Sequence, residues 1–232
     1  MDIEQLKRRA GEAAAAEVRR GMAVGLGTGS TVRYTIEAIG RRLAAGEIAG
    51  IVGVPTSDAT ERLARACGIQ VVTLAEQPAL DLTIDGADEV SPDLDLIKGL
   101  GGALLREKIV AAASRRLIVV VDDAKHVAKL GTLAPLPVAV VPFGWQSHIA
   151  PLWSLGAEVV LRRLPSGAVY VTDDGLHVLD CRFDHGISDP AAIEHALRLR
   201  PGIVATGLFL GMADAVYVAG AGGVECLHRR QR

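Results

Sequence analysis

The sequence predicts an α/β fold in which a parallel sheet carries helices on both faces and a smaller α+β domain is inserted. Short apolar runs alternate with helical segments as far as Val121, and such unbroken runs are typical of parallel strands covered on both faces. Three prolines close together, Pro135, Pro137 and Pro142, then interrupt this alternation. Apolar strands return after Pro201-Gly202. The 232 residues, half of them hydrophobic, fit one large or two unequal domains.

The expected elements of the parallel sheet follow one another in order. Residues 3–20 predict a helix because they are good helix formers with charges on one side. Ser57 or Asp58 is expected to cap a later helix, and Gly68 to end it. Apolar runs and periodic segments predict the remaining elements, which are strands 22–26, 48–54, 71–74, 81–84 and 117–121 and helices 32–43 and 103–114.

The inserted domain is predicted from a second series of short elements. These are strand 136–141, helix 146–155, strands 157–162, 168–172 and 176–181, and helix 189–199, with a hairpin turn at Asp174-Gly175. We expect the strands at 203–205 and 215–219 to rejoin the first sheet. The prediction is a Rossmann-like α/β domain at residues 1–131 and 203–232 and a ferredoxin-like α+β domain at residues 132–202.

Composition excludes several classes of protein. The 25 basic and 27 acidic residues give a net charge of −2, so the chain lacks the excess positive charge that favours binding to nucleic acid or an anionic membrane. Cys67, Cys181 and Cys226 show no C-x-x-C spacing, which argues against a disulfide framework or a zinc site. Neither a secretory signal nor a membrane-spanning apolar stretch is visible. We therefore expect a soluble cytoplasmic protein without a nucleic-acid or membrane partner.

The first of several polar loops lies between strand 22–26 and helix 32–43. Ligands of parallel α/β sheets gather beyond the carboxyl ends of the strands. Here Gly27-Thr28-Gly29-Ser30-Thr31 lets the backbone curl around an anion at a helix N-terminus. Ser30 stands where the third glycine of a dinucleotide-binding pattern belongs, so a small phosphate fits better. The structural alternative is a tight strand–helix turn capped by Ser30.

The second loop is acidic. Asp85-Gly86-Ala87-Asp88-Glu89 places two carboxylates three residues apart, where both can bind the hydroxyls of a polyol. A solvated turn and a metal site are alternatives. No histidine lies nearby, and Asp93 and Asp95 lack the spacing of a calcium loop.

The third loop, Lys98-Gly99-Leu100-Gly101-Gly102, opens helix 103–114, which carries Glu107. Helical spacing sets Glu107 about one turn from Ala103, so its carboxylate can face the loop, although an ordinary surface glutamate is the alternative. Lys125 follows strand 117–121. Lysines are few in this chain, and a lysine ammonium suits a phosphate or an enolate oxygen.

In this order the motifs resemble the type A ribose-5-phosphate isomerases, and the resemblance covers nearly the whole chain. They are Gly25–Thr31, Thr56-Ser57, Asp85–Glu89, Lys98–Leu104 with Arg106-Glu107-Lys108, and Lys125. The resemblance implies an isomerase of the non-oxidative pentose phosphate pathway, which interconverts D-ribose 5-phosphate and D-ribulose 5-phosphate. It implies no metal or organic cofactor and at least a homodimer, in which the α+β domain is a plausible place for subunit contact.

The resemblance also implies roles for individual residues. Glu107 would move a proton between C2 and C1 through an enediolate, and Lys98 with loop N–H groups would stabilise the enediolate oxygen. Asp85 and Asp88 would bind hydroxyls and assist ring opening, and Lys7 is a further candidate phosphate contact. The expected substrate-binding residues are Thr28, Gly29, Ser30, Thr31, Asp85, Gly86, Ala87, Asp88, Lys98, Gly99, Leu100, Gly101 and Lys125.

Two positions depart from the family pattern. Leu100 replaces a third consecutive glycine, and Leu105 stands where a polar residue is frequent. A Leu100 side chain inside the loop would narrow the sugar site, but we expect it to point away.

Other functions remain open at this point. A non-catalytic sugar-phosphate sensor would be expected to carry a DNA-reading module, for which we find no room before Met22 and no basic patch. An aminosugar-phosphate isomerase or a coenzyme A transferase should lack the combination of the second and third loops. A nucleotide-dependent oxidoreductase is disfavoured by the missing glycine at position 30.

Overall fold

The computed structural model describes residues 2–229, which form two compact units. The first unit contains the residues up to Ala87, Arg106–Lys125 and the chain from Gly211 onward. The second contains Asp88–Leu105 and His126–Leu210. The boundaries that we predict at 131/132 and 202/203 stay a prediction. Residue 1 and residues 230–232 of the predicted first domain lie outside the described residues.

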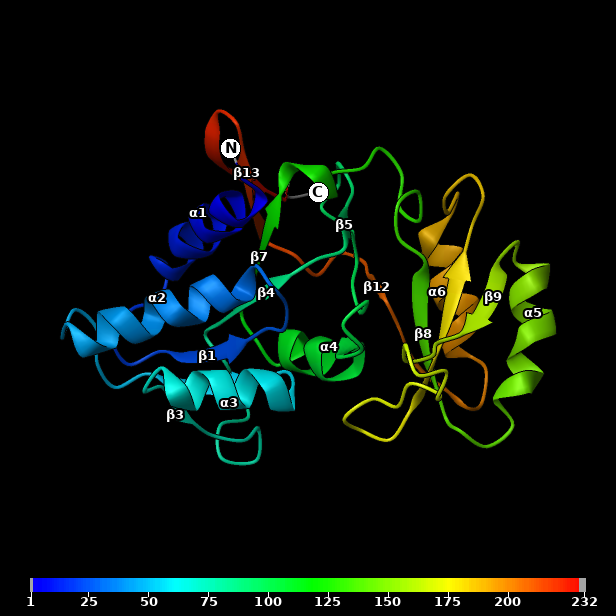
Figure 1. Cartoon of the computed structure of the whole chain (residues 1–232), viewed down its shortest axis with the longest axis horizontal. Coiled ribbons are helices and arrows are strands. Elements are labelled where there is room, and N and C mark those ends of the chain that lie inside the picture. The colour runs from blue at the N-terminus through cyan, green and yellow to red at the C-terminus, as the bar shows by residue number, and fades with distance from the viewer. Residues whose placement is uncertain (1, 230–232) are drawn as a thin grey trace. The chain divides into compact units, whose positions relative to one another are not determined.

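A seven-stranded sheet forms the centre of the first unit, and its strand order confirms the Rossmann-like prediction (Figure 1). The order is β14-β13-β7-β4-β1-β2-β3, and every neighbouring pair is parallel except β13 with β14. The strands are β1 (Ala23–Leu26), β2 (Val52–Pro55), β3 (Gln70–Val71), β4 (Leu82–Gly86), β7 (Leu117–Asp122), β13 (Ala215–Gly220) and β14 (Gly223–His228). The order reverses between β1 and β4, which makes their carboxyl ends the expected ligand position.

Helices cover both faces of this sheet. Helices α1 (Ile3–Ala15), α2 (Val32–Ala44) and α3 (Asp58–Ala66) share one hydrophobic core cluster with Val24 and Leu26 of β1. Helix α4 (Leu104–Ala112) lies on the opposite face, where its Val110 packs against Ala23. Because side chains alternate along a strand, neighbouring residues of β1 serve the two faces.

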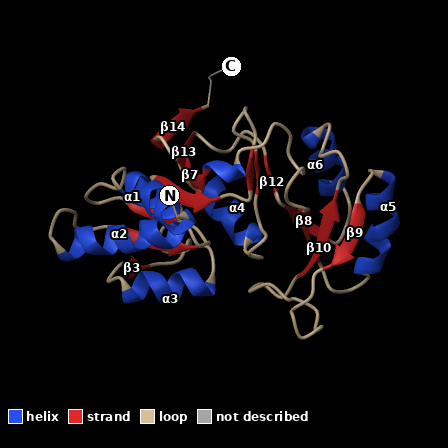
Figure 2. Ribbon diagram, turned by 45° about the horizontal axis from the view of Figure 1, so that its top comes forward, coloured by secondary structure: helices blue, strands red, loops and turns tan. Residues whose placement is uncertain are grey.

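The second unit contains the predicted ferredoxin-like arrangement (Figure 2). Its elements are β8 (Leu136–Val140), a short 3-10 turn η2 (Trp145–His148), α5 (Ile149–Ser154), β9 (Glu158–Leu161), β10 (His177–Arg182), α6 (Pro190–Arg198) and β11 (Ile203–Thr206). The antiparallel order β11-β8-β10-β9 is that of a βαββαβ motif. A small sheet adds β5 (Glu89–Val90), β6 (Leu96–Ile97) and β12 (Leu208–Phe209).

Several expectations were wrong in detail. Strand 203–205 does not rejoin the first sheet, because β11 pairs with β8 and only the strand predicted at 215–219 returns, as β13. Residues 168–172 form no strand beyond a bridge between Arg163 and Val169, because turns flank them closely on both sides. The first helix ends at Ala15 instead of residue 20. Within residues 2–229, no helix is long and apolar enough to cross a bilayer.

Candidate active site

The glycine loop after β1 lies against Asp85 at the point where the strand order reverses. Asp85 Oδ1 accepts hydrogen bonds from the backbone N–H of Thr28 at 3.1 Å and of Gly86 at 2.7 Å. A Cβ at Gly27 would lie 2.1 Å from Asp85 Oδ1 and 2.6 Å from Asp85 Cα, so only glycine allows this approach. The structure therefore brings together the first two predicted loops, as expected for neighbouring strands.

A cluster of buried hydroxyl groups holds Thr28 from the side. Thr28 Oγ1 lies 2.7 Å from Thr56 Oγ1, 2.8 Å from Ser57 Oγ and 3.1 Å from Thr60 Oγ1. Thr60 in turn donates to the Gly27 carbonyl at 2.9 Å. Thr56-Ser57 was expected as part of the family motif and Ser57 also as a possible helix cap, whereas Thr60 was not predicted. Three hydroxyl residues within five positions after a strand end were the available signal.

The rest of this loop leaves the start of α2 open to an anion. Gly29, with φ +139°, and Ser30 are both exposed, and the Ser30 side chain makes no hydrogen bond with the described residues. Thr31 occupies the N-cap position without a side-chain capping bond, so the alternative of a Ser30 cap is wrong. Backbone N–H groups at a helix N-terminus are suited to a phosphate.

Glu107 lies in the first turn of α4 and is only 4% exposed, so it is not an ordinary surface glutamate. Its neighbour Arg106 pairs with Asp58 at the start of α3, with Nη1 2.7 Å from Oδ1. This ion pair connects the helix that carries Glu107 to the helix that contributes the hydroxyl cluster. Glutamates this deeply buried are uncommon and point to a specific role.

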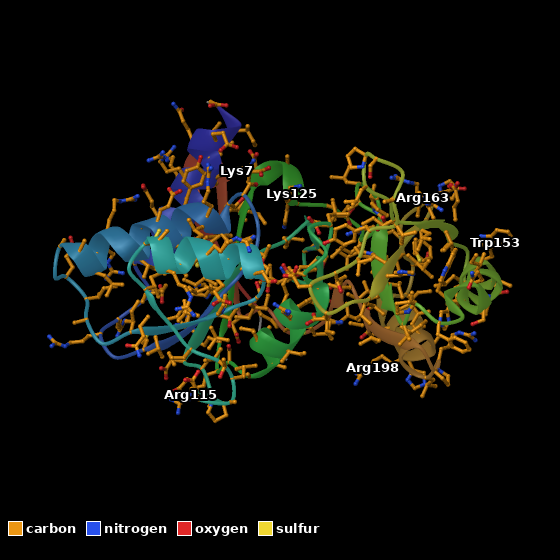
Figure 3. The ribbon with its side chains drawn as sticks, turned by 60° about the horizontal axis from the view of Figure 1, so that its bottom comes forward. Lys7, Arg115, Lys125, Trp153, Arg163 and Arg198 are labelled. Atoms are coloured by element: carbon orange, nitrogen blue, oxygen red, sulfur yellow. The ribbon has the colours of Figure 1, made fainter. Side chains whose placement is uncertain are left out.

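Lys7 and Lys125, the two lysines of the first unit that we expect near the phosphate, differ in their surroundings (Figure 3). Lys125 is half-buried in the short turn Asp123–Lys125 that follows β7. Lys7 on α1 is paired with Glu4, with its ammonium 2.8 Å from the carboxylate. Glu4 also accepts from the Tyr34 hydroxyl at 2.6 Å, and Lys7 with Tyr34, both hydrogen-bonded to it, lower its pKa.

The second unit holds Asp88 and the third loop. Asp88 Oδ2 accepts a hydrogen bond from the Leu100 N–H at 2.9 Å, so this carboxylate is fixed to the glycine loop. Lys98 is 2% exposed, and its ammonium lies 5.4 Å from the centre of the Phe209 ring. A lysine buried to this extent and placed over an aromatic ring is held in one position.

Leu100 fits the loop without backbone strain. Gly99 has φ +105° and Gly102 has φ +83°, whereas Leu94 is the single non-glycine residue with positive φ in the described part of the chain. Leu100 therefore adopts an ordinary backbone conformation, and the residue is 42% exposed. The departure from the family pattern falls at a position that does not require glycine.

Glu89, the last residue of the acidic motif, has a structural task. It is fully buried, and its carboxylate accepts the backbone N–H groups of Gly131, Leu133 and Ala134 at 2.5, 2.5 and 2.7 Å. Among residues 2–229, no group of three or more His, Cys, Asp or Glu side chains is placed to hold a metal ion.

Comparisons with known proteins agree with the geometry. A family model described as ribose 5-phosphate isomerase A (phosphoriboisomerase A) matches residues 52–223. The chain is 54% identical to ribose-5-phosphate isomerase A of Gloeobacter violaceus, over 98% of this chain and 97% of that one. It is 48% identical to the same protein of Deinococcus radiodurans, over 99% and 100% of the two chains.

Solved structures also superpose closely over nearly the whole chain. A D-ribose-5-phosphate isomerase in complex with phospho-erythronic acid superposes with a TM-score of 0.96 at 39% identity, over 99% of this chain and 100% of that one. Ribose 5-phosphate isomerase from Plasmodium falciparum superposes with a TM-score of 0.94 at 35% identity, over 98% and 100%.

Proposed function

Since the chain belongs to the ribose 5-phosphate isomerase A family and thus interconverts ribose 5-phosphate and ribulose 5-phosphate, we propose that Glu107 is the base of this reaction. Lys98, Asp85 and Asp88 complete the proposed catalytic set. The burial of Glu107 and Lys98, on either side of the glycine loop along the chain, is the observation that carries the proposal.

In the proposed reaction, the Glu107 carboxylate takes the proton from C2 of the open-chain aldose. The electron pair of the C–H bond forms the C1–C2 double bond, and the C1 carbonyl oxygen becomes the enediolate oxygen. Lys98 and backbone N–H groups stabilise this charge, because preorganised donors contribute most where charge develops. Glu107 then returns the proton to C1, where the electron pair of the C1–C2 double bond forms the new C–H bond. The C2 hydroxyl passes its proton to the C1 oxygen, so that C2 becomes the ketose carbonyl and C1 carries the hydroxyl.

The remaining residues bind the substrate in this proposal. Asp85 and Asp88 accept hydrogen bonds from sugar hydroxyls and assist opening of the furanose ring. The phosphate lies at the start of α2, where the N–H groups of Thr28, Gly29, Ser30 and Thr31 and the helix dipole favour an anion. Lys125 adds positive charge, and Gly86, Ala87, Gly99, Leu100 and Gly101 complete the substrate-binding set.

The proposal is tested by substituting the base. Glu107→Gln should abolish conversion of ribose 5-phosphate to ketose, measured with EDTA present, because an amide cannot accept the C2 proton. Ribose 5-phosphate should still bind within a few-fold of the wild-type affinity by calorimetry, since the phosphate contacts are intact. The matched control is Glu158→Gln, an exposed glutamate on β9. Turnover by Glu107→Gln at the control rate would show that the base is misassigned.

We also propose, from the resemblance, a cytoplasmic enzyme that forms a homodimer or larger assembly. Light scattering coupled to size-exclusion chromatography tests the assembly, and a monomer at the working concentration would contradict it.

A further inference from the structure

We propose that Arg162 is a positioning residue, which holds the Gly99 and Leu100 carbonyls to one side so that the N–H of Gly101 receives the enediolate oxygen. The inference rests on the proposed function of this loop. Arg162 follows β9, far along the chain from Lys98–Gly102, and no sequence motif includes it.

Arg162 binds the loop and an acidic partner at the same time. Its Nη1 donates to the carbonyl oxygens of Gly99 and Leu100, each at 3.0 Å. On its other edge, Nε donates to Asp180 Oδ2 at 2.9 Å and Nη2 to Asp180 Oδ1. The side chain is 12% exposed. Such a bidentate ion pair fixes the plane of the guanidinium, and the Asp180 carboxylate neutralises its charge. The contribution of Arg162 to the loop is therefore orientation rather than added positive charge.

Peptide planarity transmits this orientation to the N–H groups. In a trans peptide the N–H points opposite to the C=O. The carbonyl of the Gly99–Leu100 peptide faces Arg162, and its N–H donates to Asp88 Oδ2 at 2.9 Å. The carbonyl of the next peptide also faces Arg162, so the N–H of Gly101 points away from it. A Cβ at Gly101 would meet no atom within 4 Å, so the space beside this peptide is open.

Tyr170 extends the same pattern to a third carbonyl. Its hydroxyl donates to the Gly101 carbonyl at 3.2 Å, and its ring lies 5.6 Å below the Arg162 guanidinium. The hydroxyl oxygen also lies 2.0 Å from the position of a Cβ at Gly102, so glycine is required there. Three successive carbonyls are thus held by two side chains of the second unit. Within this loop the Leu100 N–H is bound by Asp88 and the Gly102 N–H donates to the Gly99 carbonyl at 2.9 Å, so the Gly101 N–H is the donor oriented for an anion.

The experiment compares Arg162→Met with Arg163→Met. Methionine keeps the apolar stem and removes the hydrogen bonds, and Arg163 (Figure 3) is the exposed neighbour whose guanidinium donates to the Gly167 carbonyl. We expect Arg162→Met to lower kcat about 10- to 100-fold with KM changed less than about three-fold, because the loop acts on the developing charge. The affinity for phospho-erythronic acid, whose carboxylate resembles the enediolate, should fall with kcat/KM, whereas inorganic phosphate should bind unchanged.

A second variant keeps the inference testable if Arg162→Met folds poorly. Arg162→Ala leaves a space of guanidinium shape beside Asp180, and millimolar guanidinium should restore part of the lost kcat. A merely structural role predicts no such rescue. The inference is overturned if Arg162→Met matches Arg163→Met in kcat and in phospho-erythronic acid affinity. It is also overturned if phosphate affinity falls by the same factor as kcat. Neither result depends on Glu107→Gln, which reports on the base alone.

Discussion

Glu89→Gln is a sharp test of the structural task assigned to the last acid of the sequence motif. The two oxygens of Glu89 accept three backbone N–H groups, Gly131 on Oε2 and Leu133 and Ala134 on Oε1. Glutamine has the same shape, but one oxygen becomes an NH₂ group that can only donate. The better orientation keeps the amide oxygen near Leu133 and Ala134 and places the NH₂ group against the Gly131 N–H.

The magnitude follows from these three bonds. One charge-assisted hydrogen bond is lost, which costs about 1.5–3 kcal/mol, and a buried N–H is left facing another donor. The two surviving bonds become neutral and lose about half of their strength. Relief of the buried charge offsets part of this loss. We therefore expect the free energy of unfolding to fall by about 2–5 kcal/mol, which corresponds to a Tm lower by about 4–20 °C.

The assay is urea and thermal unfolding followed by circular dichroism, with Glu158→Gln as the exposed control. Isomerase activity per folded molecule, measured well below the Tm, should stay within a few-fold of wild type because Glu89 is not in the proposed substrate set. A loss of stability below about 0.5 kcal/mol would refute the reasoning. So would a severe loss of activity in a variant of normal stability, which would place Glu89 in the site.

Two further predictions concern the second unit. Gly102→Ala should lower the free energy of unfolding by about 1–3 kcal/mol, because φ is +83° and Tyr170 Oη lies 2.0 Å from the new Cβ, whereas Gly101→Ala should change it by less than about 0.5 kcal/mol. Equal losses for the two variants in urea titrations would contradict this. Burial, and then the charge of Asp180, raise the pKa of the Cys181 thiol from 9.0 to about 12. The unfolded chain therefore loses this proton first, and stability should fall between pH 9 and about 12 by up to about 1.4 kcal/mol per pH unit. In urea titrations across this range, the free energy of unfolding should fall less steeply with pH for Cys181→Ala than for the wild type. The same slope for both proteins would show that the Cys181 thiol is not the group responsible.

The parallel sheet could be predicted because its strands are continuous apolar runs, and such runs are visible without a partner. Which sheet a strand joins could not be predicted. Ile203–Thr206 has the same apolar character as Ala215–Gly220, yet the first pairs with β8 and the second with β7. The Val141 N–H donates a backbone hydrogen bond to the Gly202 carbonyl, next to the paired strands β8 and β11. A bond between backbone groups does not depend on the side chains, so the sequence pattern does not reveal it.

The candidate site was predicted where its residues follow strands along the chain. The loop at Thr28 and the acid at Asp85 lie together because the carboxyl ends of adjacent parallel strands meet. Arg162 and Tyr170 could not be found this way, because they reach the glycine loop from a distant segment that has no regular structure at Tyr170. Local pattern also cannot separate Asp88 from Glu89, neighbours whose carboxylates bind different loops.

The position of the second unit within the chain bears on the order of events during synthesis. Strands β7 and β13 pair side by side, but residues 123–214 are translated between them. Closing so long a loop costs little additional entropy, since that cost grows only with the logarithm of length. The delay is kinetic: until β13 leaves the ribosome, β7 presents an apolar strand edge, which is a template for aggregation. A slowly maturing insert would therefore reduce the yield of protein, while every molecule that did finish folding would be fully active.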